Sequence, residues 1–350
     1  MYNNTHVVGD HILISNFVKY ERLEQLIYSQ FYNSGYEEIN LFIDAYSMIK
    51  SVYGYDPSQF IDKFSIASCI INACAHYRKF FWTRYGVTCK IYIVFSRMTE
   101  SIAEARCFYP EYNNIFLTEN NPAMDKTIED NMEILNILCP YIPDVMFIYS
   151  QFESGLVFGR LCDPSKPNII ISKDLWNLQV VANTLNTYMI RPIKKNGEDL
   201  SVIINHDNVI PYYLQFRKVN SNEGFIPSEY LSFIMAATRF PERGMKSLHN
   251  LTTVIKNLSN AIEKKYIPIG QRIYDIEGLC KDLNSVNRTN LKEFEIGLRM
   301  NAMGFNPCMY RYMTSPKADK IDMINLHDPD SVKRINDTYF RKVPLDLNAL

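Results

Sequence analysis

Two apolar runs that each lead to an aspartate constrain the fold of this chain more than any other feature. The run at 41–44 reads Leu-Phe-Ile-Asp, and the run at 168–174 reads Asn-Ile-Ile-Ile-Ser-Lys-Asp. As neighbouring parallel strands, they would place Asp44 and Asp174 at the carboxyl edge of one sheet, where open α/β sheets bind ligands. Paired carboxylates at such an edge can hold divalent metal ions.

The composition is that of a folded protein, because 47% of the 350 residues are hydrophobic and 21% are charged. The formal net charge is −1, so contact with nucleic acid would depend on a local basic patch. The 8 cysteines form no C-x-x-C pair and no cluster with zinc spacing, which favours reduced thiols in the cytoplasm. We expect no signal peptide, because the start of the sequence has neither a basic n-region nor an apolar h-region. We expect no membrane partner, because no apolar run approaches the roughly 20 residues of a membrane span.

Strand and helix patterns alternate along the first half of the chain. We expect strands at 41–43, 90–95, 143–149 and 168–171, helices at 11–34, 60–85, 130–138 and 152–161, and a polar loop at 113–130. This alternation predicts an α/β fold with a doubly wound, mostly parallel sheet. From about residue 198 the pattern changes. Segments 200–204 and 210–216 are predicted to form a β-hairpin, and helical segments follow it.

Several short motifs follow one another in a recognisable order. They are Arg106–Asn113 (RCFYPEYN), Glu153–Leu156 (ESGL), Ser172–Gln179 (SKDLWNLQ), Gly224–Pro227 (GFIP) and Thr238–Gly244 (TRFPERG). With Asp44 before them, this order resembles the 5′-nucleases with a PIN-like fold, the flap endonucleases and 5′→3′ exonucleases of phages and bacterial polymerases. The resemblance runs from about residue 40 to about residue 260.

The departures from the family pattern fall mainly on acids. Where the family has aspartates, this chain has Ser96, Gly155, Leu156, Trp176 and Arg239, and Glu242 replaces a further one; the family's phosphate-contacting lysine is Asn113. Two-metal hydrolysis needs anionic oxygens that hold two cations about 3.5–4 Å apart. A guanidinium at position 239 would repel such a cation. The resemblance therefore implies a degenerate active site.

Four acids remain at positions where the family binds metal: Asp44, Glu153, Asp174 and Glu242. They could hold a single Mg²⁺ or Mn²⁺, but we expect no tightly bound cofactor and assign no catalytic residue, because Mg²⁺ needs several carboxylates or phosphates to stay bound. A purely structural interpretation is also open. Asp44 and Asp174 could cap the helices that follow them, and Glu153 could be a first-turn acid that the helix dipole favours.

A basic segment resembles the part of the family that grips duplex phosphates. Its candidate nucleic-acid-binding residues are Arg239, Arg243, Lys246 and Lys256, with Arg106 as a further candidate in the earlier motif. Lysine and arginine bind phosphates without reading bases. The alternative is an ordinary solvated helical face.

The resemblance implies a helical extension at 1–38, a PIN-like domain at 39–220, and a helix–loop–helix-type domain with a tail at 221–350. We expect a nuclease-derived protein with little or no catalysis that binds branched or duplex DNA or RNA, or joins other protein subunits, in the cytoplasm. One alternative is an active metal-dependent 5′-nuclease with a reduced metal site. Another is an assembly subunit that does not bind nucleic acid. The many Asn, Ile and Tyr residues suit an AT-rich genome, such as that of a bacteriophage.

Overall fold

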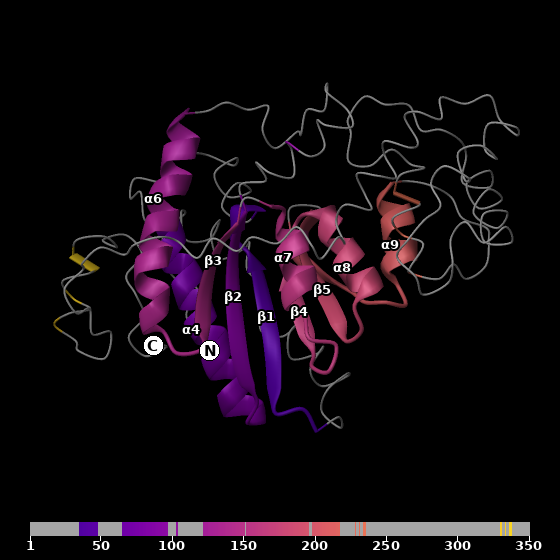
Figure 1. Cartoon of the computed structure of the whole chain (residues 1–350), viewed down its shortest axis with the longest axis horizontal. Helices are drawn as coiled ribbons and strands as arrows, with labels where there is room; N and C mark the ends of the chain where they lie inside the picture. The colour runs from indigo at the N-terminus through magenta and orange to yellow at the C-terminus, as the bar shows by residue number, and fades with distance from the viewer. Residues whose placement is uncertain are drawn as a thin grey trace, which may run out of the picture.

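A six-stranded sheet in the order β3-β2-β1-β4-β5-β6 forms the centre of the computed structural model (Figure 1). The structure describes residues 35–47, 65–96, 122–150, 152–195 and 198–217, and single residues at 103, 228, 231, 234, 235, 330, 333, 336 and 337. The strands are β1 (Glu38–Asp44), β2 (Thr88–Ser96), β3 (Val145–Ser150), β4 (Asn168–Ile171), β5 (Thr187–Lys195) and β6 (Glu198–Ile204). All pairs are parallel except β5 with β6. The prediction of an α/β fold with a mostly parallel sheet is confirmed.

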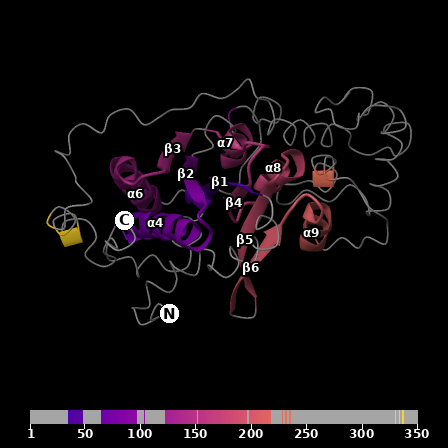
Figure 2. The same ribbon diagram turned by 90° about the horizontal axis from the view of Figure 1, so that it is seen from below.

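Helices cover both faces of the sheet, which is why its central strands are apolar on both sides. Figure 2 shows α4 (Ser65–Tyr85) and α6 (Pro122–Leu138) on one face, and α7 (Ser154–Leu161) and α8 (Leu178–Asn183) on the other. Successive residues of a strand point to opposite faces. Leu41 and Ile43 of β1 accordingly belong to the core under α4, whereas Phe42 belongs to the core under α7.

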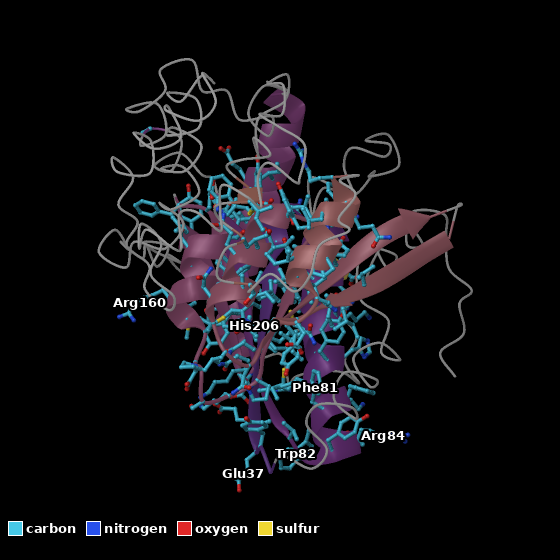
Figure 3. The ribbon with its side chains drawn as sticks, turned by 90° about the vertical axis from the view of Figure 1, so that its right-hand side faces the viewer. Glu37, Phe81, Trp82, Arg84, Arg160 and His206 are labelled. Atoms are coloured by element: carbon cyan, nitrogen blue, oxygen red, sulfur yellow. The ribbon has the colours of Figure 1, made fainter. Side chains whose placement is uncertain are left out.

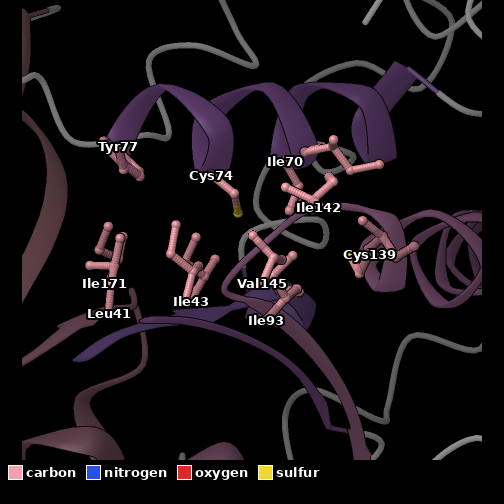
Figure 4. Packing of buried hydrophobic residues seen from close by; sticks show 14 of the residues in the cluster. Leu41, Ile43, Ile70, Cys74, Tyr77, Ile93, Cys139, Ile142, Val145 and Ile171 are labelled. Carbon is pink, nitrogen blue, oxygen red and sulfur yellow. The ribbon is translucent and has the colours of Figure 1, made fainter. Parts of the chain in front are cut away.

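The core under α4 contains cysteines that behave as small apolar residues. Cys74 and Tyr77 of α4 point toward the sheet, where Leu41 and Ile43 lie (Figure 4). Burial raises the pKa of the Cys74 thiol well above its usual range, so the thiol stays neutral. The cysteines in the described part of the chain are Cys69, Cys74, Cys89, Cys139 and Cys162, and all are free and buried. The prediction of reduced thiols agrees with these residues.

A glycine ends α4 and turns the chain into β2. Gly86 has φ of +64°, the left-handed conformation that glycine adopts without a steric penalty. Its N–H donates to the carbonyl of Trp82 at 2.9 Å, and the N–H of Val87 donates to the carbonyl of Phe81 at 3.4 Å. The bond from Gly86 to the carbonyl of Trp82 is the 5→1 bond of an αL helix cap. The predicted helix is therefore confirmed over 65–85, and residues 60–64 lie outside the described residues.

The predicted hairpin of 200–204 with 210–216 is wrong. Strand β6 pairs with β5, and α9 (Val209–Phe216) is a helix. Its buried residues Val209, Ile210, Tyr213 and Leu214 recur at the spacing of one helical face, and Pro211 lies in its first turn, where a missing N–H costs nothing. The predicted loop at 113–130 is also wrong over its second part, because α6 already begins at Pro122.

Other predictions fall outside the described residues. These include the helix at 11–34 and nearly all of 221–350, so the domain boundaries stay predictions. None of the described helices is long and apolar enough to cross a membrane.

Candidate functional site at the carboxyl edge of the sheet

Asp44 and Asp174 lie at the same edge of the sheet. Asp44 is the last residue of β1, and β4 beside it ends at Ile171. The chain then passes through Ser172 to Asp174, which precedes the short 3₁₀ helix η3 (Leu175–Asn177). Parallel strands bring their carboxyl ends together at one edge, so the sequence expectation for this pair of aspartates is met. The predicted strands at 41–43, 90–95, 143–149 and 168–171 correspond to β1, β2, β3 and β4, which are neighbours in the sheet.

Neutral donors surround the carboxylate of Asp44. Its Oδ2 accepts hydrogen bonds from Ser172 Oγ at 2.7 Å, Ser154 Oγ at 3.1 Å and Asn177 Nδ2 at 3.2 Å. Its Oδ1 accepts from the backbone N–H of Ser47 at 3.2 Å, which caps the helical turn at 45–47. Asp44 is 2% exposed. One buried side chain thereby joins β1 to the start of α7, the end of β4 and η3.

The donors are cross-linked to one another. Asn177 Nδ2 also donates to Ser172 Oγ at 2.8 Å, and the backbone N–H of Asp174 donates to the same hydroxyl at 3.0 Å. Ser172 in turn donates to Asp44. Because each hydroxyl both accepts and donates, the cluster of Asp44, Ser154, Ser172 and Asn177 forms a connected network, and such buried networks hold one arrangement of the chain. We refer to these four residues as the Asp44 network.

Burial raises the pKa of Asp44, and the hydrogen bonds from Ser172, Ser47 and Ser154 offset part of that rise. Among the residues that the structure describes, no lysine or arginine donates to its carboxylate. Burial also raises the pKa of Asp174 to about 6, and the nearby carboxylate of Asp44 adds to the rise. Asp44 is therefore close enough to Asp174 to raise its pKa. The carboxylate of Asp44 itself accepts hydrogen bonds from neutral groups.

Asp174 caps η3. Its Oδ1 accepts a hydrogen bond from the backbone N–H of Trp176 at 2.9 Å. Arg191 on β5 lies near enough to lower the pKa of Asp174, in opposition to burial. The structural interpretation that Asp44 and Asp174 cap the segments after them therefore describes both side chains.

Glu153 and Ser96 complete this edge of the sheet. Glu153 is 5% exposed and stands at the N-cap position of α7, where its backbone carbonyl accepts from Leu156 at 3.0 Å. Its side chain makes no capping hydrogen bond. Ser96, the last residue of β2, donates through Oγ to the carbonyl of Phe152. Ser96 thus ties β2 to the loop before α7, at the position where the family resemblance expects an acid.

Asn177 and Gly155 fit one another. A Cβ atom built on Gly155 would lie 2.8 Å from Asn177 Oδ1, closer than real Cβ contacts come. The amide of Asn177 therefore fills the space that a side chain at position 155 would enter. Leu156 next to it is 6% exposed. Of the two positions where the family resemblance expects adjacent aspartates, position 155 has no space for a carboxylate in this packing, and position 156 holds a buried leucine.

The chemistry of these residues does not fit a pair of divalent cations. Among the residues that the structure describes, no group of three or more His, Cys, Asp and Glu side chains is placed to hold a metal ion. Both oxygens of Asp44 already accept hydrogen bonds, and a cation would have to displace Asn177 and the serine hydroxyls. Mg²⁺ dehydrates reluctantly and is bound through carboxylates and phosphates. The serine hydroxyls and the Asn177 amide point hydrogens at Asp44 Oδ2, the oxygen that a Mg²⁺ ion would have to bind.

Three of the four candidate metal ligands, Asp44, Glu153 and Asp174, lie at or after the carboxyl ends of β1, β3 and β4. Within the described part of the chain they do not form a group that is placed to hold a metal ion. Glu242, Arg106, Arg239, Arg243, Lys246 and Lys256 lie outside the described residues, so their roles stay predictions. Sequence reasoning missed Ser154 and Asn177, although both lie inside motifs that were recognised. It also missed Arg191, because β5 was not predicted.

The sheet and this cluster define an α/β protein with a buried polar network at the carboxyl edge of its mostly parallel sheet. No protein-family model and no curated protein matches the chain. Among solved structures, the chain is similar to the crystal structure of the T5 D15 protein co-crystallized with metal ions, with 10% sequence identity and a TM-score of 0.44 over 87% of this chain and 98% of that chain. This is a likeness of fold, and we take the chemistry of the site from the chain's own residues.

Proposed function

We propose that this protein is a nuclease-like binding factor that has exchanged a metal site for a hydrogen-bond network, and that it binds nucleic acid without cutting it efficiently. The observation that carries the proposal is the environment of Asp44. Within the described part of the chain, its two oxygens accept four hydrogen bonds, and all four donors are neutral groups. A carboxylate that serves a metal must offer its lone pairs to the cation instead.

The replacement of acids supports the same proposal. Ser96 bonds to a loop carbonyl, and Gly155 leaves room for the amide of Asn177. These two replacements each have a structural use in this chain. A phosphodiester bond is hydrolysed by metal-dependent enzymes through cations that activate water and stabilise the leaving oxygen. The described residues supply no other group with that chemistry.

Nucleic acid is the proposed ligand because of the motif order in the sequence and the basic residues at 239–256. The test is binding of a labelled branched DNA, followed by fluorescence anisotropy over a series of salt concentrations. About four phosphate contacts should give a slope of log K against log salt near roughly −3 to −4. Lys246→Glu with Lys256→Glu should weaken binding to all sequences alike and flatten that slope.

The same preparation separates the alternatives. Incubation of a flap substrate with Mn²⁺ should leave it intact, and substantial cleavage would favour the active nuclease with a reduced metal site. For the binding measurement, Arg160→Glu is the control for the charge reversals at Lys246 and Lys256. Arg160 is an exposed cation in the last turn of α7, and its reversal should leave the affinity for DNA nearly unchanged. A wild-type protein with no salt-sensitive affinity at about 50 mM salt would sink the binding proposal and favour the assembly subunit.

A further inference from the structure

An arginine is held in a fixed position at the carboxyl edge by groups from two other elements. Arg191 on β5 lies just beyond the point where β4 ends, because Ile190 is the last β5 residue that pairs with β4. Its Nε donates to the carbonyl of Lys173 at 3.1 Å, and its Nη1 donates to the hydroxyl of Tyr212 at 3.0 Å. The guanidinium carbon lies 5.0 Å from the centre of the Phe216 ring. Arg191 is therefore oriented before any ligand arrives.

The guanidinium retains capacity for a ligand. It carries five N–H donors, and the bonds to Lys173 and Tyr212 use two of them. A planar guanidinium binds phosphate oxygens in pairs along its edge, and an aromatic ring beneath its face leaves that edge available. Arg191 is partly exposed to solvent.

Phe216 is the second half of the feature. It is a large hydrophobic residue at the end of α9, yet it is 46% exposed. The ring lies under a cation, and Arg217 follows it in the chain. Exposed aromatic rings beside arginines are how proteins hold single-stranded nucleic acid, because every base has a flat face that can stack and every nucleotide has a phosphate. A paired base within a duplex does not offer its face.

We propose that Arg191 and Phe216 form a contact for one phosphate and one unpaired base of a single nucleic-acid strand. This inference rests on the proposed function and names the part of the ligand that the α/β domain holds. Asp174 lies near enough to Arg191 for the guanidinium to lower the pKa of the Asp174 carboxyl. Its negative charge opposes a phosphate, so the contact needs Arg191 and the stacking ring together.

The chain offers matched controls at another part of its surface. Arg160 is an exposed arginine on α7, and Trp82 is an aromatic residue of α4 that is 62% exposed. In Figure 3, Trp82 lies on α4 beside Arg84, and Arg160 points away from the body of the molecule. Arg160→Gln and Trp82→Ala therefore remove the same chemical groups as Arg191→Gln and Phe216→Ala, at surfaces that the proposal does not use.

The experiment measures anisotropy of a labelled oligothymidylate of about 20 nucleotides, longer than the usual site of a single domain. Arg191→Gln should weaken binding about fivefold or more and make the salt slope shallower by about 0.7, the value for one phosphate contact with a single strand. Phe216→Ala should weaken binding about fivefold or more without changing the slope, because stacking releases no counterions. A duplex of the same length should respond much less to Phe216→Ala.

Folding is controlled in two ways. Melting temperatures are recorded for every variant, and Phe216→Leu keeps apolar packing while it removes the ring, so it should bind as poorly as Phe216→Ala. Suppose that the wild type binds the oligothymidylate, and that Arg191→Gln and Phe216→Ala change the affinity no more than the controls Arg160→Gln and Trp82→Ala do. The contact is then refuted, while the proposed function stands. If the wild type binds neither single strand nor branched DNA, the proposed function fails and the contact fails with it.

Discussion

Asn177 Oδ1 lies 2.8 Å from the place where a Cβ atom at position 155 would stand, so this position of the Asn177 amide requires a glycine at 155. Asn177 uses the other end of its amide to donate to Asp44 Oδ2 at 3.2 Å. A side chain at position 155 would push this amide away from Asp44. Gly155 on α7 and the amide of Asn177 on η3 together keep the Asp44 network closed.

The first prediction concerns this fit. Gly155→Ala should lower the free energy of unfolding by about 1–3 kcal/mol, because the new methyl group crowds a well-packed site. The measurement is urea unfolding. Gly159→Ala on the same helix is the control, because nothing lies within 4 Å of its added Cβ. It should stabilise the protein by about 0.5–1 kcal/mol through helix propensity. Equal effects of the two substitutions would show that position 155 is not closed by Asn177.

The second prediction concerns the network itself. Asp44→Ala should destabilise the protein by about 2–4 kcal/mol, because it leaves the donors of Ser154, Ser172 and Asn177 without their shared acceptor. Asp44→Asn should cost less, since one carbonyl oxygen remains. An acid retained for catalysis commonly costs stability, so its removal often stabilises. A more stable Asp44→Ala variant in urea unfolding would therefore count against a structural role.

The third prediction follows from the pKa of Asp174, which burial raises to about 6 from an ordinary value of 3.8. The folded protein then binds this proton more tightly than the unfolded chain does. The resulting loss of stability is complete above about pH 6 and disappears as the pH falls below about 4. Asp174→Asn keeps a good capping residue. It should raise the free energy of unfolding at pH 7.5 by about 1–2 kcal/mol and leave it nearly unchanged at pH 4.

Asp163 gives the opposite control for that titration. Hydrogen bonds from Ser165 lower the pKa of Asp163, so its contribution to stability is present at neutral pH and is lost as the pH falls. Asp163→Asn should therefore lower stability at pH 7.5, whereas Asp174→Asn raises it. If both substitutions shift stability in the same direction across this pH range, the burial of Asp174 is not the cause.

The fourth prediction restores acids to the edge of the sheet. Gly155→Asp alone should destabilise the protein without creating a metal site, because Asn177 occupies the space. A multiple variant should bind Mn²⁺ and show a melting temperature that rises with the Mn²⁺ concentration. It combines Gly155→Asp and Asn177→Ala with Leu156→Asp, Trp176→Asp and Ser96→Asp. The apo form should be less stable than the wild type, because clustered carboxylates repel one another and lose hydration. If Mn²⁺ stabilises the multiple variant no more than Gly155→Asp alone, these positions do not converge.

Much of the α/β domain could be predicted because its central strands are buried on both faces. Runs such as Leu41–Ile43 and Ile169–Ile171 are apolar without alternation, and each ends in a polar residue at the carboxyl edge. The strand β5 was missed because Pro192 argues against a strand. The proline is tolerated because the pairing of β4 with β5 ends at Ile190, so no β4 residue needs a hydrogen bond from the backbone nitrogen of Pro192.

The sequence predicted where the candidate site lies in the sheet, but it did not predict which residues surround Asp44. Asp44 and Asp174 were found because acids after apolar strands are a strong pattern. Ser154 and Asn177 were not, because serine and asparagine are common and only the three-dimensional arrangement shows that both reach Asp44 Oδ2. Motif order indicated where to look, whereas the replacement of a metal by hydrogen bonds depends on distances that a sequence does not contain.

The most direct test of the central claim is a titration of the wild-type protein with Mn²⁺, followed by the electron paramagnetic resonance signal of free Mn²⁺, beside Asp44→Ala. We predict that the two proteins bind Mn²⁺ equally weakly, because the Asp44 carboxylate is committed to hydrogen bonds with Ser47, Ser154, Ser172 and Asn177. Saturable binding by the wild type that Asp44→Ala abolishes would contradict this account, and would place a working metal site at the carboxyl edge of the sheet.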